Sequence, residues 1–75
     1  MLPDFDRMQA DWEGGPYVAR ALVGKFSGGM LNPRTMANRD SLGIGPPMTK
    51  FEGRVYYLVD DLIAWMRERA MVKAA

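Results

Sequence analysis

The chain has 75 residues, of which 48% are hydrophobic, 25% charged and 11% aromatic, as in an ordinary soluble globular domain. A chain this short buries only about 60% of the surface that it exposes when unfolded, so we expect one small core and no large enclosed active site. It has no cysteine and no histidine, which excludes disulfides, thiolate nucleophiles, cysteine-bound zinc and the commonest general base. We therefore predict that the protein is not an enzyme and uses no metal and no cofactor.

The first residues, MLPDFDRMQADWEGG, bear acidic side chains where a secretory signal would have a basic region followed by an apolar run. Nowhere do about 18 apolar residues follow one another, as a membrane-spanning helix requires. We expect a cytoplasmic protein with no membrane contact.

The net charge of +1 hides an uneven distribution along the chain. Residues 1–16 hold one basic and four acidic side chains, whereas residues 17–57 hold six basic and two acidic ones. A basic middle segment in a nearly neutral chain is typical of a surface that meets phosphate, although a merely solvated surface would give the same pattern.

In residues 1–16, Phe5, Met8 and Trp12 lie three and four positions apart, as on one face of a helix. This segment is either a short docking helix or a loose acidic arm anchored by Trp12. Residues 17–26 follow with an amphipathic pattern that predicts a second helix, its apolar stripe being Ala19, Leu22, Val23 and Phe26.

After a glycine-rich stop at residues 27–29, Asn32 and Pro33 form a helix start, since Asn is a preferred N-cap and Pro fits the first helical position. The pattern predicts a short helix over residues 33–40. Two glycines and two prolines in residues 43–47 then exclude regular structure and predict a loop over residues 41–47.

Residues 48–50 and 54–58 are predicted to be extended and joined across Glu52-Gly53 as a two-stranded ribbon. Asp60 is predicted to cap a final helix, with Asp61 complementing the helix dipole. The buried stripe of that helix is expected to comprise Leu62, Trp65 and Met66, continued by Met71 and Val72, with Arg67, Arg69 and Lys73 at its far end.

This order of elements predicts a mainly α fold with a small β-ribbon, the winged helix-turn-helix, over residues 17–72. In that architecture the second helix of the pair enters the major groove of DNA, and the ribbon lies beside it on the backbone.

Four segments in this order resemble the excisionase-type winged helix-turn-helix family: Asn32-Pro33-Arg34-Thr35-Met36-Ala37-Asn38, then Gly43-Ile44-Gly45-Pro46-Pro47, then Val55-Tyr56-Tyr57, then Asp60-Asp61-Leu62-Ile63-Ala64-Trp65-Met66. The resemblance covers about residues 17–68. It implies a recombination directionality factor of a prophage or other mobile element, which binds repeated sites on double-stranded DNA cooperatively, bends the DNA and directs an integrase towards excision. The implied partners are double-stranded DNA, further copies of the chain on that DNA, and an integrase.

Carried over by position, the resemblance places Arg34, Thr35, Asn38 and Arg39 towards the major groove and Lys50 and Arg54 beside the wing. Their chemistry fits, because Arg can donate two hydrogen bonds to guanine, Asn can pair with adenine, and Thr can contact a phosphate or a thymine methyl. Arg20 and Lys25 are weaker candidates for contacts with the DNA backbone. The family usually has an aromatic residue where Arg39 stands and a basic or polar one where Asp40 stands. An acid at the groove would repel phosphate, so either Asp40 points away from it or the recognition positions are shifted along the helix.

Other interpretations remain open. The chain could be a plain transcriptional regulator. It could also be a protein-interaction module on the same fold, whose acidic front (residues 1–16) meets a partner through Phe5, Met8 and Trp12. Phe51, Tyr56, Tyr57 and Trp65 could form a base-stacking set, but alternation on a ribbon turns only one of the two tyrosines inward, so a core role is favoured.

Overall fold

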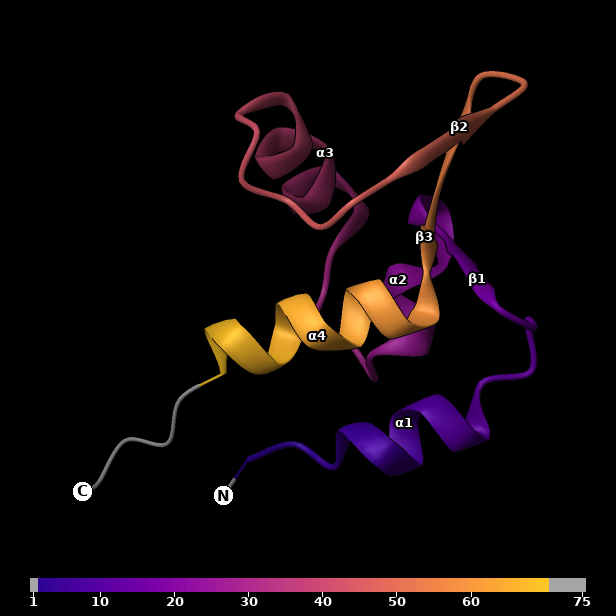
Figure 1. Ribbon diagram of the computed structural model, residues 1–75, viewed down its shortest axis with the longest axis vertical. Helices are drawn as coiled ribbons and strands as arrows, with labels where there is room; N and C mark the ends of the chain where they lie inside the picture. The colour runs from indigo at the N-terminus through magenta and orange to yellow at the C-terminus, as the bar shows by residue number, and fades with distance from the viewer. Residues whose placement is uncertain (1, 71–75) are drawn as a thin grey trace.

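A computed structural model describes residues 2–70 as a small mixed α/β structure with four α-helices and a three-stranded antiparallel sheet (Figure 1). The ribbon of the sheet and α3 lie at one end of the long axis, and α1 lies at the other. In chain order the elements are α1 (Phe5–Asp11), β1 (Tyr17–Ala19), a 3₁₀ helix (Arg20–Leu22), α2 (Val23–Phe26), α3 (Pro33–Ser41), β2 (Thr49–Phe51), β3 (Arg54–Leu58) and α4 (Val59–Arg69).

The acidic front contains the helix α1, which is the first of the two forms expected for it. The Asp4 side chain caps this helix by accepting a hydrogen bond from the Arg7 backbone N–H at 3.0 Å. Phe5 is buried, and Met8 and Trp12 pack against the core, so the spacing of these three residues does mark the inner face.

Helix α1 lies antiparallel to α4, at the end of the molecule away from the ribbon (Figure 1). Asp6 pairs with Arg67 near the end of α4 at 2.8 Å, and Gln9 donates a hydrogen bond to Asp60 near its beginning at 2.5 Å. The Arg67 guanidinium also lies over the Phe5 ring, 5.1 Å from its centre. These contacts dock the front of the chain on its last helix.

The prediction of a helix over residues 17–26 is wrong for the first half of this segment. Residues 17–19 form strand β1, which pairs with β3 in the register Tyr17↔Leu58, Val18↔Tyr57 and Ala19↔Tyr56. Backbone pairing with β3 replaces the intrahelical hydrogen bonds, and Gly24 weakens the remaining helical segment, so only a 3₁₀ helix and the four-residue α2 follow. As a result Val18 is fully buried, whereas Leu22, placed in the predicted stripe, is 45% exposed.

The turn before α3 is held by one buried hydroxyl. The Ser27 side chain donates a hydrogen bond to the Val23 carbonyl at 2.7 Å and accepts one from the Leu31 N–H at 2.8 Å. Gly28 and Gly29 both have positive φ, 64° and 94°, which side chains rarely adopt. The connection therefore needs its glycines, as the sequence suggested.

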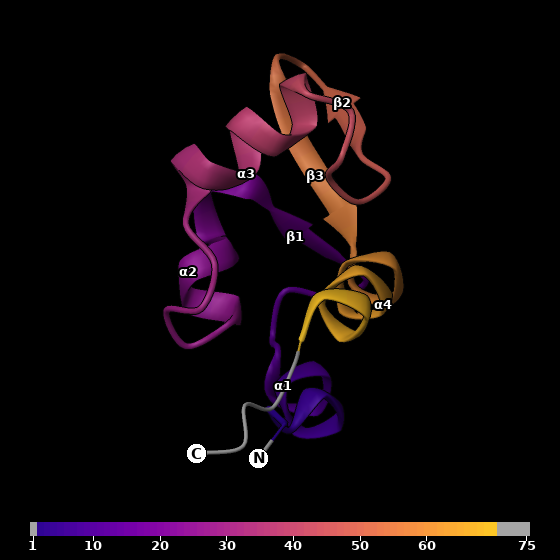
Figure 2. The ribbon, with the colours of Figure 1, turned by 90° about the vertical axis from the view of Figure 1, so that its left-hand side faces the viewer.

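Helix α3 begins where the sequence predicted and ends at Ser41. The Asn32 side chain caps it, accepting from the Arg34 N–H at 2.9 Å and the Thr35 N–H at 3.4 Å, and Pro33 is the first helical residue. In Figure 2, α3 runs from above α2 towards the ribbon. Met36 fixes its inner face because its side chain is fully buried.

The predicted ribbon is present as β2 and β3, but it is part of a sheet with the order β1-β3-β2, so the expectation of two strands alone is corrected. Glu52 and Gly53 at its tip have φ of 50° and 80°, and two positive φ angles are the signature of a tight type I′ hairpin turn. Facing residues in an antiparallel pair share a side of the sheet. Lys50, Val55 and the buried Tyr57 therefore share the inner side.

Helix α4 starts one residue before the predicted cap. Leu58 holds the N-cap position without a side-chain hydrogen bond, so Asp60 does not cap the helix as predicted but lies in its first turn with Asp61. Both still complement the helix dipole. Met71, Val72 and Lys73, which were predicted to extend the helix, lie outside the described residues.

One core joins all these elements. Leu62, Ile63, Trp65 and Met66 of α4 are buried against the inner side of the sheet, α2 and α3; the other members are Phe5, Val18, Val23, Phe26, Met36, Tyr57 and Val59. Between residues 2 and 70, no helix is both long and apolar enough to traverse a lipid bilayer.

Candidate nucleic-acid interface

Helix α3 presents three polar side chains on its outer face. Arg34 and Asn38 are four residues apart and Thr35 lies beside them, so all three share the side opposite the buried Met36. All three are exposed, and none of their side chains makes a hydrogen bond or ion pair with residues 2–70. The structure thus brings together three of the four predicted recognition residues with their donors and acceptors free.

The inner side of α3 is anchored by Asp40. Its carboxylate accepts a hydrogen bond from the Arg20 guanidinium at 2.6 Å and another from the Tyr57 hydroxyl at 2.5 Å. The Asp40 side chain is only 3% exposed, and that of Arg20 is 24% exposed. Asp40 therefore points away from the outer face, which is the first of the two alternatives expected for it. Its partners tie α3 to β3 and to the 3₁₀ helix after β1.

Burial and hydrogen bonding shift two ionisation equilibria in this network. Burial raises the pKa of Tyr57 from 10.0 to about 12, and the hydrogen bond to Asp40 adds to the increase. The pKa of Arg20 is raised as well, chiefly by its hydrogen bond with the Tyr57 hydroxyl at 3.2 Å. At neutral pH, Arg20 is therefore charged and Tyr57 carries its proton.

Because Gly45 has no side chain, the Asp40 carboxylate can occupy the space beside it. A Cβ atom at this position would overlap the Asp40 Oδ1 atom. Oδ1 is buried and has no hydrogen-bond partner among the described residues, so the anchor makes its two hydrogen bonds through the other oxygen, Oδ2. The Gly-Pro-Pro loop thus packs directly against the anchor of α3.

Arg39, the fourth predicted recognition residue, is placed differently from the other three. It is half-buried, and its guanidinium lies over the Trp65 ring of α4, 5.4 Å from the ring centre. Arg69 lies near the same ring, at 4.6 Å. Arg39 is therefore at the edge of the outer face, beside α4.

The two predicted wing residues lie on opposite sides of the ribbon. Lys50 faces Val55 on the inner side, the side from which Tyr57 reaches α3, whereas Arg54 faces Phe51 on the outer side. Both cations are exposed. Only Lys50 shares its side of the ribbon with α3.

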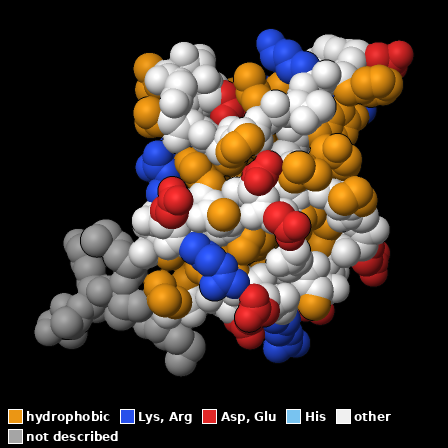
Figure 3. All heavy atoms as spheres, viewed as in Figure 1, with side chains coloured by type: hydrophobic (Ala, Val, Ile, Leu, Met, Phe, Trp, Pro, Cys, Tyr) orange, Lys and Arg blue, Asp and Glu red, His pale blue; other side chains and the backbone are white. Residues whose placement is uncertain are grey.

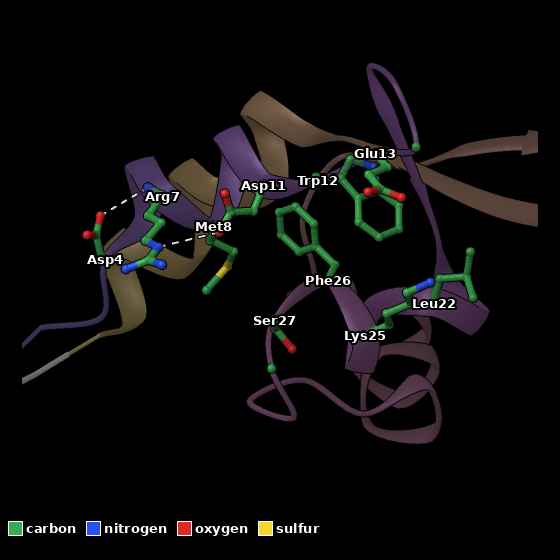
Figure 4. Close-up of a pocket in the computed structure, with 12 residues that line it drawn as sticks. Asp4, Arg7, Met8, Asp11, Trp12, Glu13, Leu22, Lys25, Phe26 and Ser27 are labelled. Carbon is green, nitrogen blue, oxygen red and sulfur yellow. Dashed lines mark hydrogen bonds and ion pairs between the residues drawn. The ribbon is translucent and has the colours of Figure 1, made fainter.

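The two weaker candidates do not join the outer face of α3. Arg20 is held by Asp40, and Lys25 lies on α2 at a cavity of about 700 Å³ between α1 and α2. Figure 4 shows Lys25 beside Leu22, with Phe26 and Trp12 at the centre of this cavity and the acidic side chains of Asp4, Asp11 and Glu13 at its border. The Trp12 and Phe26 rings meet edge to face, with centres 5.4 Å apart.

The aromatic residues considered for base stacking are divided between the core and the surface. Tyr57 and Trp65 are buried, which confirms the core role for these two. Phe51 and Tyr56 instead lie with Tyr17 on the outer side of the sheet, around an apolar hollow of about 320 Å³. Figure 3 shows hydrophobic side chains gathered over the ribbon and below it, on the right of the view.

Sequence reasoning missed the partners of Asp40 and the arginine pair at Trp65. An acid inside a basic segment was a usable signal for a buried ion pair, but the pattern does not say which of the six cations Asp40 would pair with. Arg69 was placed only at the far end of the last helix. No spacing rule relates it to Arg39, because the two meet through tertiary packing alone.

Comparison of the chain with protein-family models, with curated proteins and with solved structures finds no match. Within residues 2–70 no group of three or more acidic side chains is placed to hold a metal ion.

Proposed function

We propose that the protein is a winged helix-turn-helix that binds double-stranded DNA, with α3 in the major groove and the β2–β3 ribbon as its wing. The observation that carries the proposal is the division of α3 into two sides. Its inner side is fixed by Met36 and by the Asp40 ion pair, while Arg34, Thr35 and Asn38 face outward without partners in the described part of the chain. A helix fixed in this way can present polar side chains to base edges in a constant geometry.

The chemistry of the three outward residues suits base recognition. Arg34 can donate two hydrogen bonds to guanine, and Asn38 can both donate to and accept from adenine. Thr35 can contact a phosphate or the methyl group of thymine. Lys50, on the same side of the ribbon as α3, supplies a phosphate contact, and Arg54 supplies one from the opposite side.

The arrangement of elements supports the same function. A short helix, a glycine-containing turn and α3 precede a hairpin and a final helix, which is the order of a winged helix-turn-helix. In this proposal Arg20 positions α3 through Asp40 and does not contact DNA. Lys25, at the cavity between α1 and α2, is left out of the interface.

The biological role that we propose is that of a recombination directionality factor acting with an integrase. It rests on the resemblance of the α3, Gly-Pro-Pro and α4 motifs to excisionases. One domain of this size contacts few base pairs, so useful specificity requires several copies on repeated sites or a partner protein. A transcriptional regulator of a mobile element would use the same surface, and a gene position beside an integrase gene distinguishes the two roles.

The decisive experiment is selection from a pool of random duplex DNA at two salt concentrations, followed by sequencing of the bound fraction. We expect enrichment of a short motif and an affinity that falls steeply with salt. Arg34→Ala and Asn38→Ala should relax the motif, at a cost of about 1–3 kcal/mol for each lost base contact, whereas Lys50→Ala should weaken all sequences equally.

Arg7→Ala is the matched control for these variants. It removes one exposed arginine from α1, at the opposite end of the molecule from α3 and the ribbon (Figure 1). Its affinity and motif should equal those of the unmodified protein. Weak binding without a motif, unchanged in Arg34→Ala and Asn38→Ala, would contradict the proposal.

The cavity between α1 and α2 favours a second candidate function, a protein-interaction module. It is the largest of the described hollows, at about 700 Å³, and combines the Trp12 and Phe26 rings with acidic residues such as Asp4, Asp11 and Glu13. This candidate predicts that Trp12→Ala abolishes function in the cell while Arg34→Ala and Asn38→Ala leave it intact. The DNA-binding proposal instead predicts that Arg34→Ala and Asn38→Ala abolish function.

A further inference from the structure

A cleft of about 330 Å³ beside α3 and α4 brings two arginines to one tryptophan. The Arg39 and Arg69 guanidinium groups lie 5.4 and 4.6 Å from the centre of the Trp65 ring, and all three side chains border the cleft. The remaining wall is mainly apolar and includes Phe5, Leu31 and Met66. Cation–π contacts of this kind hold a guanidinium in place while leaving its N–H groups directed sideways.

The arrangement is fixed by hydrogen bonds to one backbone carbonyl. The Ile44 carbonyl oxygen accepts a hydrogen bond from the Trp65 indole N–H at 3.0 Å and another from the Arg69 guanidinium at 2.9 Å. Ile44 belongs to the loop that follows α3, so this carbonyl links the loop to α4. Both the ring and Arg69 are thus positioned before any ligand arrives.

The two cations lack a counterion in the described structure. The ion pairs between residues 2 and 70 involve Arg7, Arg20 and Arg67, and neither Arg39 nor Arg69 has a carboxylate within 4.0 Å. The Arg39 guanidinium also makes no hydrogen bond within this part of the chain. Two like charges held at one ring repel each other, and an anion in the cleft would relieve the repulsion and use the free N–H donors.

The position of the cleft indicates which anion would reach it. Arg39 follows Thr35 by four residues, so the two are neighbours on the surface of α3. Arg39, which borders the cleft, therefore lies next to the outward face that carries Arg34, Thr35 and Asn38. A polyanion lying along that face would pass the mouth of the cleft.

We propose that Arg39 and Arg69, held against Trp65, form a clamp for a phosphate of the DNA backbone, beside the groove that α3 enters. This inference rests on the proposed function and deepens it. It changes the role predicted for Arg39 from base reading to phosphate binding, and it adds the end of α4 to the DNA-binding surface.

The test is the salt dependence of binding to random-sequence duplex DNA, measured by fluorescence anisotropy with the full chain. Each phosphate contact contributes about −0.9 to the slope of log K against log salt. Arg69→Gln should therefore reduce the magnitude of the slope by about 0.9, so that a fourfold rise in salt weakens this variant about 3.5-fold less than the unmodified protein. Arg39→Gln should act in the same way.

Arg67→Gln is the matched control, since it removes the same charge from the same last turn of α4, on the side that pairs with Asp6. Its slope should equal that of the unmodified protein. As a second readout, DNA should shift the Trp65 indole N–H resonance in the unmodified protein but not in Arg69→Gln. Trp12→Phe assigns that resonance, because the chain has two tryptophans.

Three results would overturn the clamp while leaving DNA binding intact. The first is a slope in Arg69→Gln that equals that of the unmodified protein. The second is an equal decrease of the slope in Arg67→Gln and Arg69→Gln. The third is binding of an oligoglutamate peptide at Trp65 while the slope for DNA stays unchanged in Arg69→Gln. The last result would assign the cleft to an acidic protein segment. Absence of DNA binding by the unmodified protein would instead overturn the proposed function, and the clamp with it.

Discussion

Arg20 and Asp40 form a nearly buried ion pair, with 2.6 Å between the guanidinium nitrogen and the carboxylate oxygen. The pair joins the segment after β1 to α3, and the Tyr57 hydroxyl donates to the same oxygen from β3. The side of α3 that faces outward is thus determined by a polar contact on its other side. A buried charge that loses its partner is costly, so this contact should affect stability strongly.

Replacement of Asp40 by Ala should destabilise the fold. Arg20 and Tyr57 would both lose their acceptor in a region of low exposure, and we expect a loss of about 2–3 kcal/mol in the free energy of unfolding, measured by urea denaturation. Asp11→Ala is the control, because the Asp11–Arg7 pair is exposed and should contribute less than about 0.5 kcal/mol. Equal effects of the two substitutions would contradict the assigned role of Asp40.

The pKa of Tyr57 predicts a loss of stability in alkali. The pKa of Tyr57 is about 12 in the folded protein, against 10.0 for a tyrosine exposed to water, as in the unfolded chain. The unfolded chain therefore releases this proton first as the pH rises. The contribution of Tyr57 is complete below pH 10.0 and is lost between pH 10.0 and about 12, amounting to about 3 kcal/mol. Urea denaturation over this range measures it.

Tyr57→Phe should remove that part of the alkaline dependence, at the cost of the hydrogen bond to Asp40. Tyr56→Phe is the matched control, since Tyr56 lies on the outer side of the sheet and has no contact with Asp40. The control should retain the alkaline loss. Identical pH profiles for both variants would rule out Tyr57 as its source.

Loss of the cap of α3 should weaken the fold by a smaller amount. Asn32→Ala removes the acceptor for the N–H groups of Arg34 and Thr35, and we expect a cost of about 1 kcal/mol. Asn38→Ala changes the same residue type on the outer face of the same helix and should stay within about 0.5 kcal/mol of the unmodified protein. Thermal unfolding followed by circular dichroism compares the two.

Substitution by alanine should change the stability of the protein in opposite directions at two glycines. Gly45→Ala places a Cβ atom on the Asp40 carboxylate and should destabilise the protein by about 2 kcal/mol. Gly24→Ala, inside α2, meets only the Leu31 carbonyl oxygen at an ordinary 3.5 Å and should stabilise the protein by about 0.5–1 kcal/mol. Stabilisation by Gly45→Ala would show that the loop does not pack on the anchor as described.

The elements with local signals were predictable from the sequence. Asn32 and Pro33 determine the start of α3 through capping and a fixed φ, and Gly53 permits the hairpin turn. The inner face of α1 follows from the spacing of Phe5, Met8 and Trp12, because a helix places residues three and four apart on one side. These features depend on neighbours in the sequence.

Features that depend on distant partners were not predictable. Residues 17–19 carry part of a helical pattern, but their pairing with β3 provides backbone hydrogen bonds that local propensity does not describe. From the sequence alone, Arg20 is a candidate for a phosphate contact, because nothing in the local pattern indicates that it pairs with Asp40. Likewise, Lys50 and Arg54 are close in sequence, yet the alternation of the strands separates them.

The acidic helix α1 and the cationic end formed by α3 and the ribbon lie at opposite ends of the long axis (Figure 1). A nearly neutral molecule with this separation has an electric dipole moment, and the field of a polyanion exerts a torque on it. The protein should therefore turn its α3 end towards such a surface before the two touch. At physiological ionic strength this alignment acts over only about 8 Å, so it should speed productive encounters most strongly at low salt.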